Sequence, residues 1–139
     1  MDTDETRIRE LEAETHPQKL LHKELTETVI GAAYEVPNVL GYGFLEKVYQ
    51  RALQAELIRH GLRAEIERAL QVTYKGIVVG DYFADLVVEE KVIVELKVSP
   101  ELNPYDEAQL INELKATGFR VGLVVNFGRS RVEFRRRVV

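Results

Sequence analysis

Apolar residues that recur at intervals of three and four mark two helices in the first part of the chain. This spacing runs from position 21 to position 36, and Pro37 is expected to end the first helix. A Gly-Tyr-Gly turn at 41–43 leads into a second helix over 44–60, which Gly61 should close in a left-handed conformation. The side chains expected to face inward from the second helix are those of Leu45, Val48, Ala52 and Leu57.

The period of the apolar positions then changes to two, which is the spacing of strands. Strands are predicted over 66–74, 77–88 and 92–98, with turns at 75–76 and 89–91. The apolar residues expected to share one face of the first of these strands are Ile66, Leu70, Val72 and Tyr74. Three alternating segments joined by short turns predict an antiparallel meander.

A third helix has strong signals at both of its ends. They are an N-cap, a first-position proline, two acids in the first turn and a closing glycine: Asn103, Pro104, Asp106, Glu107 and Gly118. Two further strands are predicted over 119–127 and 131–139. The third helix should cross back over the sheet and place strand 119–127 parallel to strand 92–98. The predicted fold class is therefore α/β, with a mixed central sheet flanked by helices.

Length and composition narrow the class of protein. A chain of 139 residues suits one domain, and the absence of cysteine excludes disulfides, thiolate metal sites and a cysteine nucleophile. The first 19 residues have no apolar period and are expected to form a mobile acidic tail, which leaves 20–139 as a single domain. The acidic start does not resemble a secretory signal, and no apolar run approaches the roughly 18 residues of a membrane span. These features predict a cytoplasmic protein with no membrane partner.

The charge is distributed unevenly along the chain. The net charge of −4 argues against a nucleic-acid partner, but residues 1–19 alone hold six acids against three bases. The last eleven residues hold five arginines against one acid. These arginines could contact backbone phosphates, or they could protect a final edge strand from pairing with other chains.

Outside the turn at 89–91, three charged residues interrupt the apolar stretch FADLVVEEKVIVELKV at 83–98: Asp85, Glu95 and Lys97. Period two places Glu95 and Lys97 on the face opposite Val92, Val94 and Leu96. A hairpin that turns at 89–91 can bring Asp85, on the face of Phe83 and Val87, close to Glu95. Two carboxylates and an amine are therefore expected to converge.

The converging carboxylates can be explained in two ways. A divalent ion such as Mg²⁺ or Mn²⁺ would relieve the repulsion between Asp85 and Glu95, and Lys97 could then orient or deprotonate a water or steady charge on a phosphate. Alternatively, charged residues alternate with apolar ones in any half-exposed strand, and Glu95 with Lys97 could form an ordinary surface pair. The first interpretation predicts phosphodiester hydrolysis.

A second motif, GFLEKVY at 43–49, places Glu46 and Tyr49 three residues apart on one helix face. Both side chains can therefore face the same neighbouring element. They could equally be an acid that stabilises the helix N-terminus beside a core tyrosine.

Together these motifs resemble the GxxExxY family of the PD-(D/E)XK nuclease superfamily, over about residues 20–128. The residues that match the family pattern are Gly43, Glu46, Tyr49, Asp85, Glu95, Lys97, Gln109, Asn126, Phe127 and Gly128. The resemblance implies a restriction-endonuclease-like core of order αβββαβ. It implies that Asp85 and Glu95 hold the metal, that Lys97 assists the attacking water, that Glu46 is an additional ligand and that Gln109 borders the site.

Some positions depart from the family pattern. The family often has a histidine where this chain has Pro37, a basic residue near Glu107 and an aromatic residue at Glu113. All residues of the D…ExK set are present, but these departures make the predicted site more acidic than is usual in the family. Nucleic-acid affinity should therefore depend on metal.

The sequence thus predicts a nuclease that uses Mg²⁺ or Mn²⁺ and acts on nucleic acid, with DNA favoured over RNA as the substrate. The residues expected to contact the nucleic acid are Tyr49, Asn126, Arg129 and Arg131, although Asn126 suits a turn equally well. A nuclease that cuts both strands of a duplex often works as a symmetric pair, which favours a homodimer. The alternative is a non-catalytic module that binds nucleic acid or protein on the same fold.

Overall fold

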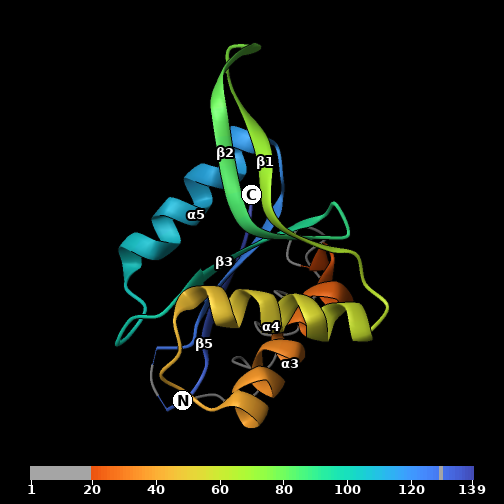
Figure 1. Cartoon of the computed structure of the whole chain (residues 1–139). Helices are drawn as coiled ribbons and strands as arrows, with labels where there is room; N and C mark the ends of the chain where they lie inside the picture. The colour runs from red at the N-terminus through yellow and green to blue at the C-terminus, as the bar shows by residue number, and fades with distance from the viewer. Residues whose placement is uncertain (1–19, 129) are drawn as a thin grey trace, which may run out of the picture.

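The structure is a computed structural model that describes residues 20–128 and 130–139. The element order is the predicted one: α3 (Lys23–Leu40), α4 (Glu46–Arg59), β1 (Ala64–Tyr74), β2 (Ile77–Val88), β3 (Val92–Lys97), α5 (Pro104–Thr117), β4 (Val121–Asn126) and β5 (Glu133–Val138). Figure 1 shows their arrangement along the chain. The acidic tail 1–19 and Arg129 lie outside the described residues, so the predictions made for them are not addressed by this structure.

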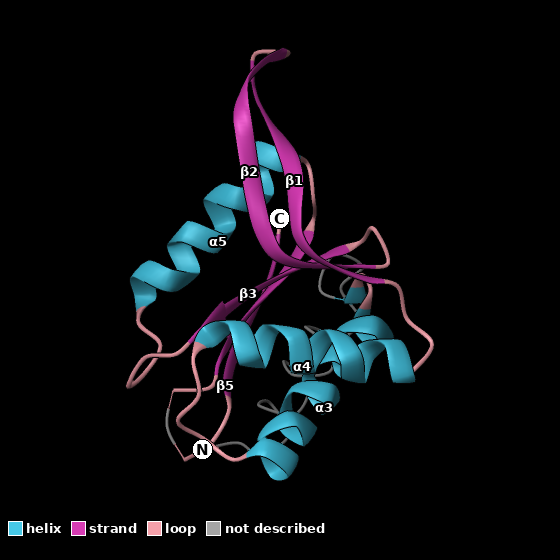
Figure 2. Ribbon diagram, viewed as in Figure 1, coloured by secondary structure: helices cyan, strands magenta, loops and turns pink. Residues whose placement is uncertain are grey.

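The strands described form a five-stranded sheet in the order β1-β2-β3-β4-β5. The pair β3–β4 is parallel and the other pairs are antiparallel. Helix α5 makes the crossover between β3 and β4 on one face of the sheet, while α3 and α4 cover the other face (Figure 2). The predicted mixed α/β sheet, its crossover and its flanking helices are confirmed.

Helix α3 does not end at Pro37, as its sequence predicted. It continues to Leu40, and Gly41 ends it with φ 79° and a backbone N–H that donates to Pro37 O at 2.7 Å. A proline in the last turns removes one intrahelical hydrogen bond, and the burial of Pro37 offsets that loss. The helix therefore tolerates the residue that was expected to break it.

The predicted inward face of α4 was wrong for two of its four residues. Leu45 is 80% exposed and precedes the helix as its N-cap, and Val48 is also exposed. The fully buried residues are Tyr49, Leu53 and Leu57, at intervals of four. A single helical stripe packs on the sheet, and the burial of Tyr49 turns Leu45 and Val48 away from it.

The ribbon formed by β1 and β2 bends where it leaves the sheet. Ile66 pairs with Leu86 and Arg68 pairs with Ala84, while the intervening Glu67 takes φ 50°. The bend transfers alternate residues to opposite faces, so Ile66 packs with the α3–α4 side and Leu70 lies in the cluster under α5. The predicted common face of this strand therefore does not exist. Beyond the bend the ribbon extends as an arm away from the sheet (Figure 1).

Helix α5 begins at a capping box and packs closely on the sheet at Gly122. Its N-cap Asn103 accepts from the backbone of Asp106, and the Asp106 side chain accepts from Asn103 N, which completes a capping box. A Cβ added at Gly122 on β4 would lie 2.7 Å from Leu110 Cδ1, so only glycine permits this approach without displacement. This close packing fixes which face of α5 is turned toward the sheet.

Candidate active site

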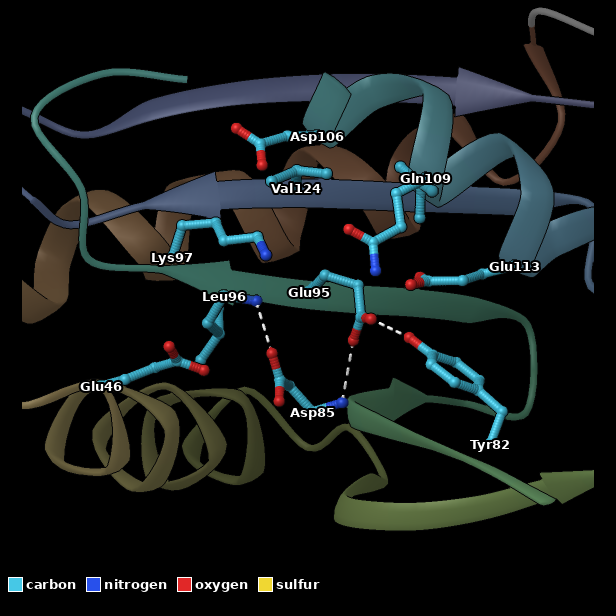
Figure 3. Close-up of a pocket in the computed structure, with 11 residues that line it drawn as sticks. Glu46, Tyr82, Asp85, Glu95, Leu96, Lys97, Asp106, Gln109, Glu113 and Val124 are labelled. Carbon is cyan, nitrogen blue, oxygen red and sulfur yellow. Dashed lines mark hydrogen bonds between the residues drawn. The ribbon is translucent and has the colours of Figure 1, made fainter. Parts of the chain in front are cut away.

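Strands β2 and β3 part at the acidic end of their hairpin. Their regular pairing ends at Leu86 with Val94. Beyond that pair the Asp85 backbone N–H donates to Glu95 Oε1 at 2.9 Å, and the Leu96 N–H donates to Asp85 Oδ2 at 2.8 Å (Figure 3). Two carboxylates thus replace the main-chain bonds that the parting strands give up. This exchange fixes both acids at the point where β2 and β3 part, which we call the fork.

The fork opens into a cavity of about 220 Å³ between α4, α5 and the sheet. The five residues predicted to act in catalysis all line it, from a helix, two strands and a second helix: Glu46, Asp85, Glu95, Lys97 and Gln109. The structure therefore brings together side chains that lie as far apart in the sequence as Glu46 and Gln109. Their proximity was predicted, and their catalytic roles stay predictions.

The sequence analysis did not assign two further side chains to the site, those of Tyr82 and Glu113. The Tyr82 hydroxyl donates to Glu95 Oε2, and Glu113 reaches the cavity from α5. One signal could have found Glu113, because it lies one helical turn after Gln109 and must share its face. Tyr82 gave no comparable signal, since its approach depends on the bend in the ribbon.

Burial makes the cavity unfavourable for its own negative charges. The pKa of Glu95 is raised to about 9, first by burial and then by the neighbouring Glu113. Burial is also the main cause of the raised pKa values of Glu46, Asp85 and Glu113, and the positive charge of Lys97 only partly opposes these shifts. Four carboxyl groups with raised pKa values form a site that would be stabilised by a cation.

The donor set fits a hard divalent cation by its chemistry, because carboxylate oxygens are the ligands that Mg²⁺ and Mn²⁺ prefer. Asp85 and Glu95, which both line the cavity, could supply such oxygens. However, in the described parts of the chain no three acidic or histidine side chains are gathered closely enough to make a ready metal site. Binding therefore requires these carboxylates to reorient around the ion.

Tyr49, predicted to contact nucleic acid, is placed in the core with 0% exposure. Its ring stacks on Phe127 with centroids 4.7 Å apart, and its hydroxyl donates to Gly41 O at 2.9 Å. The same hydroxyl accepts from Phe44 N at 3.3 Å. Tyr49 thus fastens the turn between α3 and α4, which sets the start of α4 and hence Glu46, but it offers no surface to a ligand.

Asn126 is also placed inside the protein, at 1% exposure. Its Oδ1 accepts from Ser99 N and from Gly128 N, each at 3.0 Å, and its Nδ2 donates to Ser99 O at 3.0 Å and Glu133 Oε1 at 3.2 Å. These bonds use both donors and both lone pairs of the amide. The side chain fits the turn interpretation and has no group left for nucleic acid.

The arginines of the C-terminal strand are largely engaged in the fold. Arg135 and Arg137 both donate to Glu107 on α5, the first at 2.8 Å. Arg136 donates to Thr26 Oγ1 at 3.1 Å and to the Leu21 carbonyl on the other face. Of the arginines proposed as nucleic-acid contacts, Arg131 is described and exposed.

The fold and the site together define a class: a mixed α/β sheet whose two strands part at a D…ExK set, with a helical glutamate beside it. This is the restriction-endonuclease-like fold. The model of the PD-(D/E)XK nuclease superfamily matches residues 23–138, and the chain belongs to that superfamily. No curated protein matches the sequence at a significant level.

Two solved structures are similar over part of their length. The crystal structure of SSO0001 shares 18% identity at a TM-score of 0.48, covering 84% of this chain and 59% of that chain. The alkaline exonuclease LHK-Exo from Laribacter hongkongensis shares 13% identity at a TM-score of 0.39, covering 66% of this chain and 54% of that one. The chain thus spans less than two thirds of either protein. None of the helices in 20–128 and 130–139 has the length and apolarity to cross a membrane.

Proposed function

We propose that the chain is a nuclease that hydrolyses phosphodiester bonds of nucleic acid with the help of Mg²⁺ or Mn²⁺. The observation that carries the proposal is the meeting of Asp85, Glu95, Lys97 and Glu46 at one cavity where β2 and β3 part. Superfamily membership supports a nuclease type of function and a nucleic-acid substrate.

Each side chain has a role that its position supports. Asp85 and Glu95 would hold the ion, with Glu46 as a further ligand from the start of α4. A bound divalent ion would supply Lewis acidity and lower the pKa of an attacking water. Lys97 would orient that water or stabilise charge on the phosphate, and the Gln109 amide would border the substrate.

The acidity of the cavity supports the dependence on metal. Burial raises the pKa values of its carboxyl groups, and a phosphate brought beside them would add further negative charge. The ion therefore has to offset this charge before the substrate can bind. The proposal further includes membership of the GxxExxY family, DNA as the preferred substrate, one domain over 20–139, a homodimer and a cytoplasmic location.

Cleavage of plasmid and single-stranded DNA, with RNA in parallel, tests the proposal in Mg²⁺, in Mn²⁺ and with a chelator. Asp85→Ala and Lys97→Ala should each lower the rate by at least about 100-fold. Asp81→Ala and Lys115→Ala are matched controls, because both residues are exposed and outside the cavity lining. Activity that survives both cavity substitutions would refute the mechanism.

The rival function is a non-catalytic module that binds nucleic acid or protein on the same fold. It is favoured by the lack, among the described residues, of a closely gathered group of metal ligands. Calorimetric titration with Mn²⁺ separates the two functions. No binding at millimolar Mn²⁺ would favour the rival, whereas saturable binding lost in Asp85→Asn would favour the nuclease.

A further inference from the structure

Gln50 is a buried polar side chain of α4, with 4% exposure, and it is not among the residues that line the cavity. Its amide nitrogen Nε2 donates to the main-chain carbonyl of Asp85 on β2 at 2.9 Å. A carbonyl oxygen can only accept, so the nitrogen of the amide has to face Asp85. One side chain of α4 is therefore bonded directly to the backbone of a candidate metal ligand.

The main chain at Asp85 has lost its partners in the sheet on both sides. On one side, the bend at Glu67 leaves Asp85 without a paired residue in the described strand β1. On the other side, the regular pairing with β3 stops at Leu86. The N–H of Asp85 donates to the Glu95 carboxylate at 2.9 Å, and the Gln50 amide supplies the donor for its carbonyl. Two side chains thus hold the backbone of Asp85 where the sheet no longer does.

The place of Gln50 on α4 connects Asp85 with Glu46. Glu46 and Gln50 are four residues apart, so they lie on the same side of the helix. Figure 3 shows the carboxyl groups of Glu46 and Asp85 between α4 and β3. Tyr49 and Leu53 on α4 are fully buried, so core packing fixes the helix that carries Gln50. The hydrogen bond from Gln50 therefore sets the position of Asp85 relative to the helix that supplies Glu46.

Gln54, one turn further along α4, makes the same kind of bond at a different place. Its Nε2 donates to the carbonyl of Ala64, at the start of β1, at 3.0 Å. Ala64 pairs regularly with Val88, and neither residue belongs to the lining of the cavity. Gln54 thus anchors α4 to the sheet away from the candidate site, and it is a matched standard for a purely structural role.

We propose that Gln50 is a positioning residue of the candidate active site. By holding the Asp85 carbonyl, it keeps the Asp85 carboxylate at the distance from Glu46 at which both can bind one divalent ion. The inference rests on the proposed metal-dependent function and adds to it a residue that acts through the backbone of Asp85. Metal sites lose affinity and activity when the groups that orient their ligands are removed. The effect of Gln50 should therefore appear in ion binding and turnover, beyond its effect on stability.

Gln50→Met and Gln54→Met, compared as full chains, test this assignment. Met is unbranched and can fill either place without donating a hydrogen bond. Each substitution removes one bond from α4 to a main-chain carbonyl, so both should lower the Tm of the metal-free protein. In calorimetric titrations well below the Tm, Gln50→Met should weaken Mn²⁺ binding by about 10-fold or more, whereas Gln54→Met should change it less than about 2-fold. In cleavage of plasmid DNA with Mn²⁺, Gln50→Met should lower kcat by about 10-fold or more and change KM less than about 2-fold.

Asp85→Asn separates failure of this assignment from failure of the proposed function. If Asp85→Asn abolishes Mn²⁺ binding while Gln50→Met binds as tightly as Gln54→Met, the metal site stands and the positioning role of Gln50 is overturned. If the wild type itself binds no Mn²⁺, both the site and the positioning role are overturned. Gln50→Leu, which also lacks a donor, takes the place of Gln50→Met if circular dichroism shows that Gln50→Met is unfolded.

Discussion

From position 94 to 97 the two faces of β3 carry opposite kinds of side chain, whereas Ile93, near the start of the strand, is fully buried in the apolar cluster under α5. Val92, Val94 and Leu96 point into the core under α3 and α4, with at most 1% exposure. Glu95 and Lys97, between and after them, point into the cavity under α5 (Figure 3). The sharp alternation means that neighbouring residues of β3 serve different purposes, because one face stabilises the protein and the other holds charge that destabilises it.

The difference follows from the surroundings of each face. The α3–α4 side removes apolar surface from water and contributes about 25 cal/mol per Å² of it to stability. On the α5 side the strands part, and carboxylates rather than main-chain groups close the gap. From position 94 to 97, the side chains that stabilise the core and those of the candidate site are therefore separated by a shift of one residue along β3, and substitutions on the two faces of this segment should act with opposite sign.

The largest effect is expected for Leu96→Ala, which removes a fully buried side chain from the apolar face. The free energy of unfolding should fall by about 2–5 kcal/mol through lost burial and the cavity that remains. Urea denaturation measures it. Leu45→Ala is the matched control, because Leu45 is exposed, and it should change stability by less than about 0.5 kcal/mol. Equal effects in both variants would show that the assignment of the two leucines is wrong.

A smaller loss is expected for Asn126→Ala at the end of β4. The substitution leaves the backbone N–H groups of Ser99 and Gly128 without their acceptor, which should lower stability by about 1–3 kcal/mol. Thermal unfolding checks this expectation. Nucleic-acid affinity measured well below the Tm should be unchanged apart from any unfolded fraction. A weaker affinity with no loss of stability would restore Asn126 as a direct contact.

The alternation of β3 was predictable because a strand has a strict period and Lys97, Glu95 and Leu96 each fall on the expected face. The D…ExK pattern likewise predicted that Asp85 and Glu95 would meet. The sequence could not show how they meet, since the parting of β2 from β3 and the use of carboxylates in place of main-chain bonds are tertiary effects. Glu113 was noted only as a departure from the family pattern.

Other predictions were wrong where tertiary packing overrode local sequence rules. Pro37 was expected to end a helix, but its burial outweighs one missing bond. The bend at Glu67 breaks the period of β1, because a residue with φ 50° reverses the faces of the residues after it. Periodicity within one segment contains no information on such turns of the backbone, so these errors could not have been removed by closer counting.

The opposite sign is expected for Glu95→Gln on the polar face. Without metal this variant should be more stable than the wild type at pH 8 by about 1 kcal/mol, because a neutral amide can keep the acceptor for Asp85 N and donate toward Glu113. Urea denaturation with a chelator present tests it. Glu24→Gln, exposed on α3, should leave stability within about 0.5 kcal/mol of the wild type.

The stability of the metal-free wild type should depend on pH through the carboxyl group of Glu95. The pKa of Glu95 is raised from 4.5 to about 9, so the folded protein keeps a proton that the unfolded chain releases over this range. This contribution is complete below pH 4.5 and is lost as the pH rises toward 9. The wild type should therefore lose stability relative to Glu95→Gln across this window. A difference that stays constant between pH 5 and 9 would contradict the origin of the effect in burial.

The smallest effect is expected for Tyr82→Phe, which tests whether the polar face behaves as open cavity or as core. The substitution removes the hydroxyl that donates to Glu95 Oε2 and keeps the ring. A bond in a closed core would leave a buried acceptor and a large loss. Here the ring is only half-buried and the cavity is wide enough for water, so stability should fall by only about 0.5–1 kcal/mol. A fall comparable to that of Leu96→Ala would mean that Tyr82 closes the α5 face as firmly as the leucines close the other. The two faces of β3 would then differ in charge but not in packing.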